Sequence, residues 1–260
     1  MTSIITVASG KGGTGKTWFA ASLAQALARA CRVLLVDADW GLANADVQLG
    51  TMAPVDLPVD GSVEALARCI KPVGATGVQL LASASGSGRL ADLDPRTRRA
   101  LADKLKALAR AYDWTVIDLA AGAEQALRDW WRLGGRRLLV VTPDPAALTD
   151  AYAFLKLARA DGDARCAEVV VNRAPSHAGG DATAAKLERA VEHFLRLPLR
   201  RRGVLLEDPR VTAAIRAQQP FLERYPGTAT ALALEHLARG LTRAQNPSAQ
   251  PSLRPSEPAM

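Results

Sequence analysis

The chain has 260 residues, of which 48% are apolar and 23% charged, with a formal net charge of +7. These proportions exclude a wholly disordered chain, and the longest apolar runs, such as residues 138–141, are too short to span a bilayer. Three scattered cysteines argue against a disulfide framework or a zinc site and fit a reducing cytoplasm. The positive charge favours acidic partners such as nucleic acid, anionic lipid or nucleotide, although the arginine usage of a GC-rich genome explains it equally well.

Short apolar runs alternate with longer helical patterns along most of the chain. The runs lack polar alternation, which is typical of strands buried on both faces of a parallel sheet. Predicted strands cover residues 4–8, 33–37, 78–81, 115–118, 138–142, 169–172 and 203–206. Predicted helices between them cover residues 17–30, 95–112, 124–133, 146–159 and 181–195. The alternation predicts an α/β fold, a doubly wound and mainly parallel sheet of about seven or eight strands with right-handed crossovers.

The end of the chain differs from the rest. A helical pattern over residues 228–243 places Leu234, Leu237 and Leu241 on one face, which favours packing against the core over a membrane anchor. From Asn246 onward, proline recurs every three or four residues with serines between, and this composition predicts disorder. We therefore expect one folded domain over residues 1–244 and a disordered tail over residues 245–260.

A glycine-rich segment follows the first predicted strand and opens the first predicted helix. It reads Gly10, Lys11, Gly12, Gly13, Thr14, Gly15, Lys16, Thr17 and matches the G-x-x-x-x-G-K-[ST] phosphate-loop pattern. Glycines let successive backbone N–H groups face one concavity, and the helix N-terminus adds a positive dipole end. Lys16 is expected to bridge the β- and γ-phosphates of a nucleotide, and the Thr17 hydroxyl to ligate Mg²⁺.

Carboxylates follow two further predicted strands. Asp37 and Asp39 end one strand, where carboxylates can order water on Mg²⁺ or orient an attacking water; the alternative is an ordinary helix cap or turn. Asp118 ends another apolar strand, where a carboxylate without a cation or donor would be costly. Thr17, Asp39 and Asp118 are therefore the candidate metal-holding residues. Gly122, just beyond, is suited to let the backbone approach the γ-phosphate.

The second lysine of the loop, Lys11, gives the form KGGxGKT. With this residue the sequence resembles the MinD/ParA family of dimerising ATPases with a deviant Walker A loop. The resemblance implies that Lys11 reaches across a dimer interface to the partner's nucleotide, and that Asp39, within switch I (residues 39–46), activates water. Lys11, Lys16 and Asp39 are then the catalytic residues. Without the resemblance, Lys11 would read as a solvated loop lysine.

The same resemblance implies a nucleotide-binding set beyond the loop. Asn172 ends a predicted strand and is expected to recognise adenine with Arg173 beside it, although a lone Asn after a strand is more often a turn former. Asp208 is placed in the same pocket. Trp18 stands where the family usually has Thr or Asn, so only its backbone N–H is expected to contact phosphate. The implied cofactors are ATP or ADP and Mg²⁺.

Four stretches place the chain nearest the FlhG group of flagellar number regulators within this family. They are residues 36–46, residues 140–152, residues 170–173 and residues 206–226. The function implied is an ATP-dependent homodimeric switch that hydrolyses ATP and regulates flagellar number or placement, with the GTPase FlhF or another flagellar regulator or switch component as partner. Its expected location is the cytoplasm, with the periphery of the inner membrane or a cell pole as alternatives.

One rival function comes from another class of protein. A partition or positioning ATPase of the ParA type would bind DNA non-specifically in its ATP dimer. Two arginine-rich stretches, residues 96–99 and 196–202, keep this alternative open because phosphate contacts need only clustered Arg or Lys. A redox enzyme like the nitrogenase iron protein is disfavoured, since no cysteine lies near residues 119–122, which the resemblance identifies as switch II, or beside another cysteine. The first strand begins near Ser3, and we therefore expect no segment ahead of it that stimulates FlhF.

Overall fold

The structure, a computed structural model, describes residues 3–39, 44–51, 57–83, 93–163 and 165–245. Eight strands form one sheet in the order β3-β4-β2-β5-β1-β6-β7-β8, and every pairing is parallel except β3 with β4. The strands are β1 (Ser3–Ser9), β2 (Val33–Ala38), β3 (Lys71–Pro72), β4 (Val78–Leu81), β5 (Trp114–Ala121), β6 (Arg136–Val141), β7 (Ala167–Ala174) and β8 (Leu199–Leu206). The predicted doubly wound, mainly parallel sheet is confirmed.

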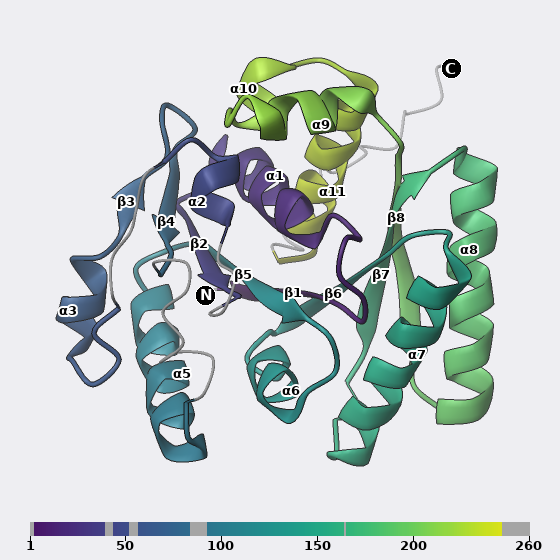
Figure 1. Ribbon diagram of the computed structural model, residues 1–260, viewed down its shortest axis with the longest axis horizontal. Coiled ribbons are helices and arrows are strands. Elements are labelled where there is room, and N and C mark those ends of the chain that lie inside the picture. The colour runs from purple at the N-terminus through teal and green to yellow at the C-terminus, as the bar shows by residue number, and fades with distance from the viewer. Residues whose placement is uncertain (1–2, 40–43, 52–56, 84–92, 164, 246–260) are drawn as a thin grey trace, which may run out of the picture.

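Helices cover both faces of this sheet (Figure 1). On one face lie α1 (Lys16–Ala28), α2 (Ala45–Gln48), α9 (Pro209–Arg216), α10 (Phe221–Arg224) and α11 (Ala229–Gln245). On the other face lie α5 (Pro95–Ala109), α6 (Gln125–Trp131), α7 (Pro145–Ala160) and α8 (His177–Ala190), which continues into the π-helical turn η1 (Val191–Leu195). The short helix α3 (Val63–Ala67) packs beside α5 at one edge.

Each face has its own apolar core, because alternate residues of a strand point to opposite sides. In β2, Leu34 and Val36 belong to the cluster under α5–α8, whereas Val33 and Leu35 belong to the cluster under α1 and α11. All four are at most 1% exposed. Burial on both faces explains why these strands read as continuous apolar runs in the sequence.

Helix α11 belongs to the core, as its sequence pattern predicted. Leu234 and Leu241 are fully buried and Leu237 is 6% exposed, and the helix packs against α1. No helix within the described ranges is long and apolar enough to cross a membrane. The predicted tail lies outside the described residues from residue 246 onward, as do residues 40–43 of the predicted switch I segment.

Candidate functional site

The phosphate loop connects the carboxyl end of β1 to the first turn of α1. Gly13 and Gly15 adopt φ of 79° and 81°, a left-handed conformation that residues with a Cβ adopt only at a cost. Gly15 occupies the N-cap position of α1, and no side chain caps the helix there. The first N–H groups of a helix have no partner within the helix, so an N-terminus without a side-chain cap suits the binding of an anion.

Lys16 and Asp118 form a buried ion pair at the centre of this site. Lys16 Nζ lies 2.7 Å from Asp118 Oδ1, and the side chains are 6% and 0% exposed. Asp118 Oδ2 accepts no hydrogen bond from the described residues. Burial raises the pKa of Asp118, and the adjacent Lys16 opposes that shift. The ammonium group of Lys16 is thus held out of water beside the N-terminus of α1. An electrostatic contact with a bound anion is stronger there than at an exposed site, because the local dielectric is lower.

Asp37 lies next to Asp118, since β2 and β5 pair with these residues in register. Its carboxylate accepts backbone N–H groups from Asp39 at 3.0 Å, Asn44 at 3.0 Å and Ala45 at 2.9 Å. Burial and the Asp118 charge raise the pKa of Asp37 to about 7, and the backbone donors oppose them. Asp37 thus connects Asp39, at the start of switch I, to Asn44 and Ala45 near its end. The sequence analysis gave it no separate role, although its place at a strand end could have suggested one.

Asp39, the predicted water-activating residue, is half-buried beside this cluster. Its backbone N–H donates to Asp37, the residue paired in register with Asp118, so Asp39 lies close to the Asp37–Asp118 pair. Lys16 Nζ also lies 3.3 Å from Thr17 Oγ1, so two of the three candidate metal-holding residues, Thr17 and Asp118, contact the same lysine. No group of three or more His, Cys, Asp or Glu able to hold a metal occurs in the described part of the chain. A Mg²⁺ held here would need its remaining oxygens from water and phosphate.

A cavity of about 760 Å³ opens beside the loop and contains the residues expected to hold the base. Asn172 is 4% exposed, and its Nδ2 donates to the Thr14 carbonyl at 2.8 Å. Trp18 also lines the cavity, and its ring packs edge-to-face on Phe221 at 5.4 Å. The walls are Gly13, Gly15, Trp18, Asn172, Arg173, Leu206, Glu207, Asp208, Pro209, Val211, Thr212, Ala213, Ile215 and Arg216.

Two polar residues of this cavity have partners within the chain. Asp208 caps α9, accepting the Arg210 backbone N–H at 3.0 Å through Oδ1 and the Thr230 hydroxyl at 2.7 Å through Oδ2. Arg173 has φ of 56° and lies 3.4 Å from Glu207. The structure therefore places Asp208 in the pocket wall with its carboxylate already bonded, while the Arg173 guanidinium, on an exposed side chain, forms only a long ion pair.

Lys11 lies on the outer side of the loop and points to a residue that the sequence analysis did not single out. Its Nζ is 2.6 Å from Asp144 Oδ2, and both side chains are more than 40% exposed. The hydrogen bond with Asp144 raises the pKa of Lys11. Asp144 caps α7 by accepting the Ala146 N–H at 3.0 Å. An Asp immediately before Pro145 is a helix-start signal, so the cap could have been predicted, but the contact with Lys11 could not.

The surrounding loops form a second cavity of about 420 Å³ beside Lys11, lined in part by Thr142, Asp144, Arg173 and Glu207. It shares Gly13, Arg173 and Glu207 with the first cavity, so the two are adjacent. Together they leave space along both sides of the phosphate loop.

Comparison with known proteins gives one consistent result. A family model described as the CobQ/CobB/MinD/ParA nucleotide binding domain matches residues 5–221. The antiactivator FleN of Pseudomonas aeruginosa is 35% identical over 242 residues, 91% of this chain and 85% of FleN. The flagellum site-determining protein YlxH of Helicobacter pylori is 30% identical over 60% of this chain and 53% of YlxH. The septum site-determining protein MinD of Pyrococcus horikoshii, solved with Mg-ADP, superposes with a TM-score of 0.74 at 27% identity, over 96% of this chain and all of that one.

Proposed function

The chain belongs to the CobQ/CobB/MinD/ParA family of nucleotide-binding domains, and on this basis we propose that it is an ATPase that dimerises with ATP and is reset by hydrolysis. The observation that carries the proposal is the buried Lys16–Asp118 pair at the open N-terminus of α1. In the proposed site, the buried Lys16 cation and the uncapped N-terminus of α1 would bind the β- and γ-phosphates of a nucleotide. Catalysis by such fixed charges requires little reorganisation when charge develops during phosphoryl transfer.

The residues around this pair fit a magnesium nucleotide. Asp118 Oδ2 is buried and has no hydrogen-bond partner among the residues that the structure describes, and the Thr17 hydroxyl lies beside the same lysine. Thr17 would hold Mg²⁺ directly, and Asp118 and Asp39 would hold its waters. The bound ion would neutralise phosphate charge. Asp39 would also orient the attacking water, and its backbone N–H is fixed for that task by Asp37.

The position of Lys11 supports a dimer in which the two active sites are shared. The side chain is paired with Asp144 at the surface rather than with a group inside its own phosphate loop. Because an exposed ion pair contributes little to stability, Lys11 can leave Asp144 at small cost. In the proposed dimer it would contact the phosphates of the nucleotide bound to the partner subunit and stabilise the transition state there.

We place this switch in the control of flagellar number or position. The support is the similarity to YlxH, whose name refers to the flagellum, and to the antiactivator FleN, together with the resemblance of the sequence to the FlhG group. A flagellar GTPase such as FlhF, or another flagellar regulator or switch component, would be its protein partner.

The structure weakens the case for the alternative, non-specific DNA binding. Three arginines of the two basic stretches are paired with carboxylates: Arg98 with Asp129, Arg201 with Asp181, and Arg202 with Glu168. These pairs reduce the positive charge available for phosphate contacts. DNA binding that requires ATP and falls steeply with salt would nevertheless restore this function.

The proposal is tested by measuring ATP hydrolysis and sedimentation of the full chain, with Mg²⁺ and with excess EDTA. We expect magnesium-dependent hydrolysis whose specific activity rises with protein concentration, because each site needs a lysine from the partner. A dimer should sediment with ATP and a monomer with ADP. Absence of ATP binding in the presence of Mg²⁺ would refute the function, and a specific activity independent of protein concentration would refute the shared site.

A further inference from the structure

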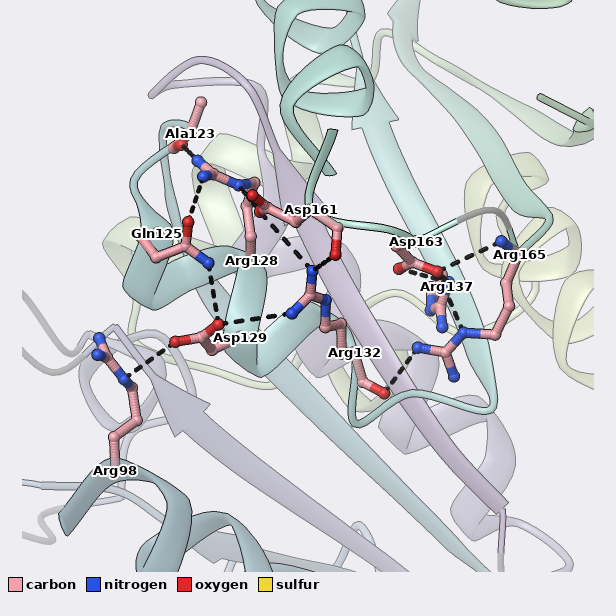
Figure 2. A network of polar contacts seen from close by, with 10 residues as sticks. All are labelled: Arg98, Ala123, Gln125, Arg128, Asp129, Arg132, Arg137, Asp161, Asp163 and Arg165. Carbon is pink, nitrogen blue, oxygen red and sulfur yellow. Dashed lines mark hydrogen bonds and ion pairs between the residues drawn. The ribbon is translucent and has the colours of Figure 1, made fainter. Parts of the chain in front are cut away.

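Arg128, on α6, joins the segment that leads into its own helix to the distant Asp161 (Figure 2). Arg128 is 8% exposed, and each of the three nitrogens of its guanidinium donates a hydrogen bond. Nε donates to Asp161 Oδ2 at 2.5 Å, Nη2 to Gln125 Oε1 at 2.6 Å, and Nη1 to the Ala123 carbonyl. A buried cation is costly without partners, so its position is determined by where these three acceptors lie.

Ala123 immediately follows switch II, the segment of residues 119–122 that continues from Asp118. Gly122, at φ of 121°, donates its N–H to the Ser9 carbonyl at 3.0 Å, directly before the phosphate loop. Arg128 donates to the carbonyl of the following residue, Ala123. The end of switch II is therefore held by two bonds: Gly122 is bonded to Ser9 at the end of β1, and the adjoining Ala123 is bonded to Arg128. Gly122 and Ala123 cannot shift together without changing at least one of these bonds.

Asp161, the acidic partner of Arg128, is the C-cap residue of α7. The N-cap residue of the same helix is Asp144, which holds Lys11 Nζ at 2.6 Å. A helix of 16 residues is roughly 24 Å long and moves largely as a unit. Helix α7 thus contacts Arg128 at its C-terminal end and Lys11 of the phosphate loop at its N-terminal end.

A further set of contacts fixes the orientation of Arg128. Gln125 Nε2 donates to Asp129 Oδ1 at 3.1 Å, and Asp129 in turn pairs with Arg98 of α5 at 3.4 Å (Figure 2). With its amide oxygen turned toward Arg128, Gln125 presents an acceptor to the guanidinium. This network is absent from the binding and catalytic set derived above, and it contacts neither cavity.

We propose that Arg128 is a positioning residue that couples switch II to α7. A displacement of Gly122 and Ala123 during hydrolysis would move the guanidinium, and through Asp161 the end of α7, so that switch II and the Lys11–Asp144 contact change together. The inference rests on the proposed ATPase function, since the displacement is caused by the nucleotide. It assigns to α6 and α7 the transmission of nucleotide state from switch II to Lys11.

The test compares Arg128→Lys with Arg165→Lys. Lys retains the charge but has one nitrogen and cannot bind three separate acceptors. Arg165 is a matched control, because it binds Asp163 Oδ1 at 3.2 Å and the Arg132 carbonyl at 2.9 Å near the same end of α7, and its described contacts do not include residues 118–125. We expect kcat of Arg128→Lys to fall about tenfold with KM within about twofold of wild type, as for a misaligned site. The control should match wild type in both constants.

Hydrogen exchange of the nucleotide-free proteins provides a readout that does not require turnover. Backbone amides of residues 119–126 should exchange faster in Arg128→Lys and in Asp161→Asn than in wild type, with exchange in the central strands unchanged. If wild type fails to hydrolyse ATP, the proposed function fails, and the exchange comparison still decides the coupling between Arg128 and switch II. Unchanged exchange at residues 119–126 in both variants, or an equal loss of kcat in Arg165→Lys, would overturn the inference.

Discussion

Replacement of Lys16 by Met should affect the nucleotide-free protein as well as its ligand. The substitution removes the cation 2.7 Å from Asp118 Oδ1 and leaves that carboxyl group fully buried. Breaking a buried ion pair by removing one partner typically costs about 3–5 kcal/mol. We therefore expect the free energy of unfolding of Lys16→Met, in magnesium-free buffer at pH 8, to fall by about that amount, and ATP binding to be lost.

The loss of stability in Lys16→Met should depend on pH through the carboxyl group of Asp118. Burial raises the pKa of Asp118, and without Lys16 that pKa should rise further. A carboxyl group whose folded-state pKa is raised stabilises the fold fully below its unfolded pKa, and this contribution is lost as the pH rises through the folded value. The deficit of Lys16→Met should therefore be larger at pH 8 than at pH 5.

The double variant Lys16→Met with Asp118→Asn separates folding from binding. It removes both charges, so its free energy of unfolding should return to within about 1 kcal/mol of wild type, while ATP binding stays absent. Urea unfolding and calorimetric titration with ATP measure the two properties. A deficit below about 1 kcal/mol in Lys16→Met would show that the ion pair contributes little in the free protein, and near wild-type ATP affinity would refute the phosphate-loop assignment.

Four further variants test other parts of the site. Asp39→Ala should bind ATP without hydrolysing it and sediment as a stable dimer with ATP and Mg²⁺; a monomer under conditions where wild type dimerises would exclude Asp39 from water activation. Lys11→Ala should bind ATP almost normally but lose turnover, and unchanged turnover in a steady-state assay would contradict the shared site. Gly15→Ala places a Cβ 2.4 Å from Asn172 Nδ2 at φ of 81°, where the left-handed conformation alone costs about 1–2 kcal/mol, so thermal unfolding and ATP titration should both show a loss. Because the Arg128 hydrogen bond lowers the pKa of Asp161, the stability deficit of Asp161→Asn in urea should be present at pH 7 and shrink as the pH falls below about 4; a pH-independent deficit would contradict the ion pair.

The long strands and helices were predictable from the sequence, and several short elements were not. All seven predicted strands are present; six differ from the prediction by at most three residues at an end, whereas β8 begins four residues before its predicted start. The two residues of β3 and the four of α2 are too few to show a hydrophobic period, so composition could not reveal them. The helix α9 did carry a start signal in Asp208 before Pro209, where Asp208 accepts the N–H of Arg210.

The predicted helix over residues 181–195 is correct in kind, but it begins four residues earlier than predicted and its last residues are not α-helical. It begins at His177 because the Ser176 hydroxyl accepts the Gly179 N–H at 3.0 Å, an N-cap that the sequence analysis did not use. Its last residues form the π-helical turn η1, which ends at Leu195 and is followed by the C-cap residue Arg196 with φ of 52°. A change in helical hydrogen bonding leaves no signature in a single sequence, whereas the cap residue does.

The location of the candidate site follows from the order of the strands. β5 lies between β2 and β1, so the carboxyl ends that carry Asp37 and Asp118 must lie beside the phosphate loop that follows β1. After β5 the chain crosses to the other side of β1 and adds β6, β7 and β8 there, so β1 is where the winding of the sheet changes direction. Open parallel sheets bind ligands at such a point. Asn172, near the end of β7, therefore reaches the loop from the side opposite the two carboxylates, and a nucleotide with its phosphates at Lys16 would extend its base toward Asn172.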